Sequence, residues 1–100
     1  MIILGQDIIE DSKRKHADAR KALDRWVELT SLGQWSNYAD LRNTFASADL
    51  VKVPGIDYTV FNIRGNQYRL IAEIKYAGMI VVVDYVLTHA DYDKDVWKEG

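Results

Sequence analysis

The spacing of hydrophobic residues changes once along this chain, and that change limits the folds it can adopt. Before residue 54 they recur every three to four residues, as on one side of a helix. After it they alternate, as on the two faces of a strand. The pair Pro54-Gly55, a turn signal, marks the change. A chain of 100 residues is long enough for one hydrophobic core. We therefore expect a single α+β domain over residues 1–100, with helices packed on a small, curved antiparallel sheet.

The first half predicts three helices. A short helix is expected from about Asp7 to Lys15. An apolar stripe at helical spacing predicts a second helix that ends near Gly33. Ser36 or Asn37 can cap a third helix that holds Leu41 and Phe45. The residues of the apolar stripe are Ala19, Ala22, Leu23, Trp26, Leu29 and Leu32.

The second half predicts strands over residues 58–64, 67–76 and 79–87, with a possible edge strand at 50–53. Gly65-Asn66 is a typical two-residue hairpin turn. Strict alternation places Asp84 on the opposite face of its strand from Tyr85. Thr88 and Asp91 have the spacing of a capping box, which predicts a short helix after the last strand.

Composition excludes several kinds of protein. There is no cysteine, so disulfides and thiolate chemistry are absent. The first residues lack the basic start of a signal peptide, and no apolar run approaches the ~20 residues of a membrane span. We therefore expect a cytoplasmic protein with no membrane partner. The net charge of −2 also disfavours simple non-specific binding to nucleic acid.

The densest group of titratable residues follows the last predicted strand. His89 can act as an acid or base near neutral pH. Tyr92 can exchange a proton, Asp93 can orient an imidazole, and Lys94 can hold charge on a phosphoryl oxygen. The alternative is that His89 is only a turn or helix-cap residue and that Asp91 is purely structural. Strand ends followed by a loop often carry functional sites.

Two further groups of charged residues have a functional and a structural interpretation. Arg69, Glu73 and Lys75 share one face of a predicted strand, where an arginine can grip a phosphate. That face can equally be the solvated side of a half-exposed sheet. The basic segment 13–25 can contact RNA or an acidic partner, or it can be a solvated helix face.

Other kinds of site lack their signatures. There is no glycine-rich phosphate loop, no HExxH motif and no serine in a nucleophile elbow. The two histidines, His16 and His89, lie in different predicted elements. We therefore expect neither a metal site nor a cofactor.

Two motifs resemble the HigB family of bacterial toxins, within the RelE-like group of type II toxin–antitoxin systems. The stretch 61–71 resembles the family's F-N-I-x-G-N-x-Y-R-L pattern, and 88–97 resembles its T-H-x-E-Y-D-K pattern followed by a tryptophan. Asp91 replaces the usual glutamate. Matching residues in the first motif are Phe61, Asn62, Ile63, Gly65, Asn66, Tyr68, Arg69 and Leu70. Those in the second are Thr88, His89, Tyr92, Asp93, Lys94 and Trp97.

The resemblance implies a RelE-like fold and the activity of an mRNA interferase, usually at the ribosomal A site. It also implies a HigA-type helix-turn-helix antitoxin as partner. The reaction would be metal-independent: the RNA 2′-hydroxyl attacks the next phosphorus and leaves a 2′,3′-cyclic phosphate and a 5′-hydroxyl. The protein would move protons and stabilise phosphoryl charge.

By chemical type, Arg69 is then the first candidate for gripping the scissile phosphate and His89 for acid–base work. Tyr92 is expected to stack on a base or share the proton transfer, and Lys94 to stabilise charge. The remaining RNA-binding candidates are Lys75, Arg64, Asn66, Lys13 and Arg14, with Asn66 also explained by the turn.

One departure from the family pattern supports an alternative function. Position 84 holds an aspartate, where related sequences often have arginine or lysine, and a carboxylate facing the RNA would repel phosphate. The alternative is a catalytically weak RelE-like domain that serves as a binding or regulatory partner of an antitoxin.

Overall fold

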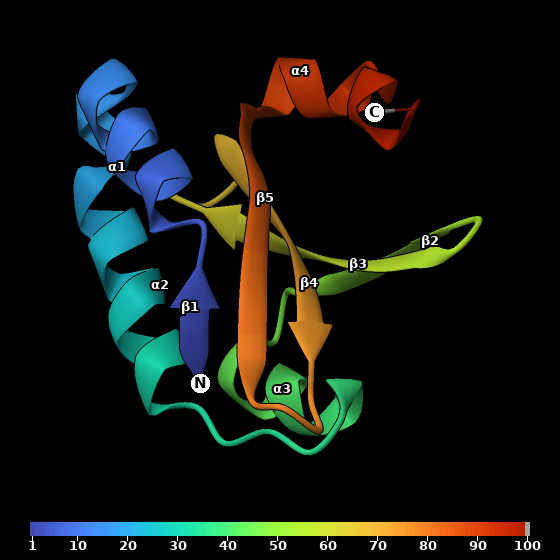
Figure 1. Ribbon diagram of the computed structural model, residues 1–100. Helices are drawn as coiled ribbons and strands as arrows, with labels where there is room; N and C mark the ends of the chain where they lie inside the picture. The colour runs from blue at the N-terminus through green and yellow to red at the C-terminus, as the bar shows by residue number, and fades with distance from the viewer. Residues whose placement is uncertain (100) are drawn as a thin grey trace.

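The computed structural model describes residues 1–99 and consists of a sheet with helices along one side and a short helical segment at its end (Figure 1). The strands are β1 (Ile2–Leu4), β2 (Asp49–Val53), β3 (Ile56–Ile63), β4 (Tyr68–Lys75) and β5 (Ile80–Thr88). The α-helices are α1 (Gln6–Lys15), α2 (Arg20–Leu32), α3 (Tyr38–Thr44) and α4 (His89–Asp93). Two 3₁₀ turns are η1 (Ala17–Ala19) and η2 (Val96–Glu99).

The sheet has five strands in the order β1-β5-β4-β3-β2. Strands β2 to β5 form the antiparallel meander that the alternating pattern predicts. Strand β1 adds to β5 in parallel, with Ile2 opposite Ile80. The α+β class is confirmed, but the sheet is mixed and β1 was not predicted. Three residues are too few to show an alternating pattern.

The helices and the sheet share one main core. Helices α1, α2 and α3 bury Ile9, Leu23, Trp26 and Leu41 against the sheet, and the indole of Trp26 meets the ring of Phe61 edge-on at 5.4 Å. Alternate residues of β4 face this core, as predicted. Leu32 does not belong to the buried stripe, because its side chain is 75% exposed at the end of α2.

A second, smaller cluster lies on the other face of the sheet. Trp97 of η2 is buried there against Tyr58, Val60 and Ile71. Its ring meets that of Tyr58 at 5.4 Å. This cluster anchors the chain after β5, so the segment that carries His89 and Tyr92 is held over the end of the sheet.

Gly5 directs the chain out of the sheet. It has φ +85°, and a Cβ at this position would lie 2.5 Å from the carbonyl oxygen of Val83. Both facts require glycine between β1 and α1. Strand β1 therefore covers the edge of β5 only as far as Val82, its last partner.

No helix within residues 1–99 has the length and apolar character needed to cross a membrane.

Candidate active site

Arg69 is the centre of a cluster at the end of the sheet. It lies on β4 opposite Leu87 and is only 9% exposed. Its Nη1 donates to the backbone oxygens of Asn66 and Tyr68, both at 3.2 Å. Its Nη2 donates to Oδ1 of Asn66 at 3.0 Å and contacts Nδ1 of His89 at 3.3 Å. The guanidinium thus joins the β3–β4 loop to the start of α4.

The loop that supplies Asn66 differs from the predicted two-residue turn. Ile63 pairs with Tyr68, so four residues connect β3 and β4. Positive φ angles fall on Arg64 and Gly65 rather than on Gly65 and Asn66. Gly65 and Asn66 do form the centre of a turn, which is closed by a hydrogen bond from the backbone nitrogen of Gln67 to the carbonyl oxygen of Arg64 at 3.3 Å. The prediction that these two residues alone connect the strands is wrong. Asn66 is the second central residue of this turn, and its side chain accepts a hydrogen bond from Arg69.

His89 is held at both ring nitrogens. An arginine can only donate hydrogen bonds, so Nδ1 accepts from Arg69 and the neutral imidazole carries its proton on Nε2. Nε2 lies 3.2 Å from Oδ2 of Asp93, one turn further along α4. The ring is half exposed and can therefore reach a substrate bound over the end of β5.

Tyr92 forms the aromatic side of the cluster. Its ring lies 5.6 Å from the Arg69 guanidinium and stacks on Trp97 at 5.4 Å with an interplanar angle of 18°. The indole Nε1 of Trp97 donates to the backbone oxygen of Tyr92 at 3.2 Å. Burial raises the pKa of the phenol above its ordinary value of 10.0. Tyr92 is therefore protonated at neutral pH and can donate a proton or hydrogen bond.

The short helix α4 begins as predicted. Thr88 is its N-cap and accepts a hydrogen bond from the backbone nitrogen of Asp91 at 3.1 Å. Lys94, just after the helix, is exposed and pairs with Asp91 at 3.4 Å. An exposed pair of this kind is weak, so Lys94 is free to turn toward a phosphate.

Two other predicted RNA-binding residues make no hydrogen bond to this cluster. Lys75 ends β4 opposite Ile80 and pairs with Glu73 at 3.8 Å. It lies six positions along the strand from Arg69, roughly 20 Å at about 3.3 Å per residue. Arg64 lies on the β3–β4 loop and binds Gln67 and Asp18 instead.

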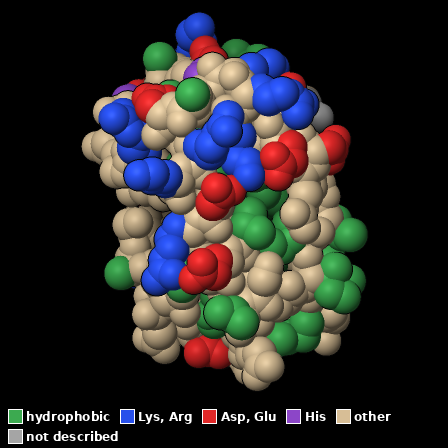
Figure 2. Space-filling view, turned by 90° about the vertical axis from the view of Figure 1, so that its left-hand side faces the viewer, with side chains coloured by type: hydrophobic (Ala, Val, Ile, Leu, Met, Phe, Trp, Pro, Cys, Tyr) green, Lys and Arg blue, Asp and Glu red, His purple; other side chains and the backbone are tan. Residues whose placement is uncertain are grey.

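The basic segment lies on the surface formed by α1 and α2, where lysine and arginine side chains alternate with carboxylates (Figure 2). Lys13 is 16% exposed and pairs with Asp24 at 2.5 Å and Glu10 at 3.2 Å. Arg14 is 70% exposed, with a longer contact of 3.4 Å to Asp11. Of these two candidates, only Arg14 extends into solvent.

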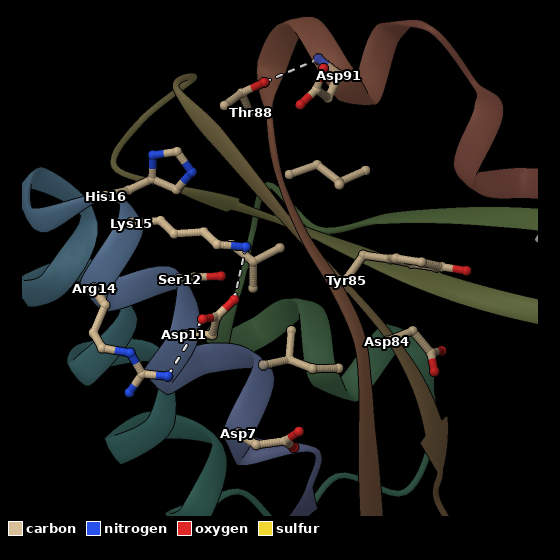
Figure 3. Close-up of a pocket in the computed structure, with 13 residues that line it drawn as sticks. Asp7, Asp11, Ser12, Arg14, Lys15, His16, Asp84, Tyr85, Thr88 and Asp91 are labelled. Carbon is tan, nitrogen blue, oxygen red and sulfur yellow. Dashed lines mark hydrogen bonds and ion pairs between the residues drawn. The ribbon is translucent and has the colours of Figure 1, made fainter.

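Asp84 lies where the alternating pattern fails. Ile71 pairs with Tyr85 and Ala72 with Val83, so Asp84 is the extra residue of a β-bulge. Figure 3 shows Asp84 and Tyr85 leaving β5 on the same side. The prediction that they point to opposite faces is therefore wrong. A bulge depends on the pairing of two strands, which one strand's sequence does not reveal.

The bulge places Asp84 beside another acid. Burial raises the pKa of Asp84 to about 6, helped by a hydrogen bond to Glu73 and by the charge of that carboxylate. Within residues 1–99, Oδ2 of Asp84 is buried without a hydrogen-bond partner. Glu73 alternates with Ile71 and Arg69 on β4, so the acid pair shares the face that carries Arg69.

A groove of about 660 Å³ lies between α1 and the edge of β5 that faces away from β4 (Figure 3). One wall is α1 and the other is β5 from Asp84 to Thr88, and Asp91 closes the end nearest His89. The groove could not be predicted from the sequence, because its walls are far apart in the chain.

No group of three or more metal-ligating side chains occurs within the described residues.

The fold and the site together define a class of protein. A meander backed by helices, with an arginine, a histidine and a tyrosine gathered where the last strand ends, is the arrangement expected of a RelE-like domain. A family model described as HigB_toxin, the RelE-like toxic component of a toxin–antitoxin system, matches residues 19–95. The chain belongs to the HigB toxin family.

Curated relatives agree with this assignment. The mRNA interferase HigB of Escherichia coli O6:H1 (strain CFT073) is 28% identical over 94 residues, covering 94% of this chain and 90% of the relative. The mRNA interferase toxin HigB of Escherichia coli K12 is 26% identical over 93 residues, covering 93% and 88%. The mRNA interferase HigB of Shigella flexneri matches to the same extent.

Proposed function

We propose that this protein is the toxin of a type II toxin–antitoxin pair and cleaves mRNA in the cytoplasm without a metal ion. The cluster of Arg69, His89 and Tyr92 is the observation that carries the proposal, because it joins a cation, an imidazole and a protonated phenol within one site. The names of the relatives, mRNA interferases, support the choice of substrate.

The chemistry follows from the contacts of His89. In the free protein Arg69 occupies Nδ1, so the imidazole has no free lone pair with which to accept a proton. A phosphate bound at the site attracts the guanidinium. We propose that Arg69 then turns toward the phosphate and releases Nδ1, which acts as the general base.

The proton steps then balance. Nδ1 of His89 takes the proton of the RNA 2′-hydroxyl as its oxygen attacks phosphorus. The bond from phosphorus to the 5′-oxygen breaks, and the Tyr92 phenol or the Lys94 ammonium gives that oxygen a proton. The products are a 2′,3′-cyclic phosphate and a 5′-hydroxyl. The carboxylate of Asp93, 3.2 Å from Nε2, stabilises the imidazolium that forms.

We also propose that cleavage takes place on the ribosome. A chain with net charge −2 has little general attraction for free RNA. We therefore propose that the ribosome presents the mRNA to the toxin. Arg14 extends from the surface and is available for such a contact. The partner that restrains the toxin is proposed to be a HigA-type helix-turn-helix antitoxin.

The Glu73–Asp84 pair favours a second candidate function. Two carboxylates on the face of Arg69 oppose the binding of a phosphate. On this second view the protein is a weak nuclease retained as a binding or regulatory partner of the antitoxin.

Expression without antitoxin in a sensitive bacterial host tests the proposal. We expect growth arrest and new 5′-hydroxyl ends in translated mRNA, both lost in Arg69→Ala and His89→Ala. Lys52→Ala, which removes an exposed cation from β2, is the matched control and should remain toxic. Normal growth with abundant folded wild-type protein would support the second candidate instead.

A further inference from the structure

The far edge of β5 is open next to the candidate site. Strand β1 pairs only with residues 80–82, because the chain leaves the sheet at Gly5. Beyond that point β4 is the one sheet neighbour of β5 within residues 1–99. From Tyr85 to Thr88 the backbone groups that point away from β4 have no strand to bind.

The two open edges of the sheet differ in how well they are protected. The outer edge, β2, carries exposed Asp49 and Lys52 and is followed by Pro54, features that discourage another strand from pairing. The open part of β5 reads Tyr-Val-Leu-Thr, with no charge and no proline. All four of these residues are only partly buried. An unprotected edge of this kind is a template for an added strand.

The groove beside this edge offers a carboxylate that could bind a basic side chain of a docked segment. Figure 3 shows Asp7 and Asp11 on the α1 wall. Arg14 and Lys15 line the groove as well, but both pair with Asp11. Asp7 has no ion pair among the described residues. An unpaired carboxylate next to a backbone edge favours a peptide with a cationic side chain.

The groove also leads to the candidate active site. Thr88 and Asp91 line its end, and His89 follows Thr88 directly. A segment that fills the groove as far as this end would lie against His89 and restrict the movement of α4. Occupation of the groove would therefore interfere with the chemistry proposed for the site.

We propose that the edge of β5 from Tyr85 to Thr88, with the groove between it and α1, docks an extended segment of the antitoxin that places a basic side chain opposite Asp7. The inference rests on the proposed function in taking the antitoxin as the partner. The segment adds a short strand to β5, so backbone hydrogen bonds supply affinity and the contact with Asp7 sets its register.

Hydrogen exchange on the unaltered toxin, alone and with the antitoxin encoded beside its gene, tests the docking site. In the free toxin we expect edge amides between residues 85 and 88 to exchange faster than those of residues 80–82, which β1 covers. Bound antitoxin should slow them at least about tenfold and leave the edge of β2 unchanged. An antitoxin that binds without protecting residues 85–88, or protection by an RNA oligonucleotide instead, would overturn the inference.

A charge reversal separates this inference from the proposed function. Asp7→Lys should weaken antitoxin binding about tenfold, measured by calorimetry, because it opposes the basic side chain. Toxicity without antitoxin should persist. Glu28→Lys reverses an exposed carboxylate of α2 and should bind antitoxin normally. If both variants bound the antitoxin with equal affinity, the docking site would be refuted. If the wild-type protein were not toxic without antitoxin, the proposed function would be refuted instead.

Discussion

Replacing Asp84 by asparagine should stabilise the protein, but only at pH values at which the Asp84 carboxylate is charged. The pKa of Asp84 is raised from 3.8 to about 6 in the fold by burial, with a further contribution from Glu73. Between these two pH values the folded protein keeps a proton that the unfolded chain releases. Stability therefore falls as pH rises through this interval, and the whole penalty is present above about pH 6.

The size of the effect follows from the same interval. Each pKa unit is worth about 1.4 kcal/mol, so the interval from 3.8 to about 6 corresponds to at most about 3 kcal/mol. The side chain is only partly buried, and solvent screening reduces the expected penalty to about 1 kcal/mol. Asp84→Asn should raise the free energy of unfolding by that amount at pH 7.5.

Urea denaturation at pH 7.5 and pH 4 measures this difference. At pH 4 Asp84 is largely protonated in the folded protein, so the gain from Asp84→Asn should nearly disappear. Asp57→Asn, at an exposed position of β3, is the control and should change stability by less than about 0.5 kcal/mol at either pH. A gain of equal size at both pH values, or none at pH 7.5, would show that the charge of Asp84 does not destabilise the fold.

Three further substitutions test the fold and the site. Gly5→Ala should cost about 2 kcal/mol of unfolding free energy. Gly55→Ala, also at positive φ but with nothing within 4 Å, should cost clearly less; equal losses would contradict the close approach to Val83. Thr88→Val removes the N-cap of α4, and about 1 kcal/mol of local stability should be lost as faster hydrogen exchange at residue 91. Tyr92→Phe keeps the stacking on Trp97 but removes the phenol, so mRNA cleavage should slow by about 100-fold; an unchanged rate would assign the proton transfer to Lys94.

The sequence predicted the parts of the fold that depend on local pattern. Residues 68–76 alternate over enough positions to assign both faces of β4, and the core confirms that assignment. The cap at Asn37, which accepts from the backbone nitrogen of Asp40, follows from local spacing as well. By contrast, β1 and the bulge at Asp84 depend on pairing between distant segments. Neither feature changes the hydrophobic pattern of a single strand in a way that can be recognised from the sequence.

The candidate site was predictable to a similar extent. The motifs named Arg69, His89, Tyr92 and Asn66, and the fold brings these four together. Alternation placed Lys75 on the face of Arg69, but sharing a face says nothing about distance along the strand. The groove between α1 and β5 and the second acid beside Glu73 require the tertiary structure, because each joins residues from separate elements.

The chemical ends left on cleaved mRNA are the sharpest test of the mechanism proposed for Arg69 and His89. Purified toxin would be added to ribosomes programmed with a defined mRNA, and both new ends would be characterised for the wild type and for His89→Ala. We expect a 2′,3′-cyclic phosphate and a 5′-hydroxyl, with cleavage abolished in the variant while tryptophan fluorescence shows an intact fold. A 5′-phosphate end, or undiminished cleavage by His89→Ala, would contradict the central role given to the Arg69–His89 pair.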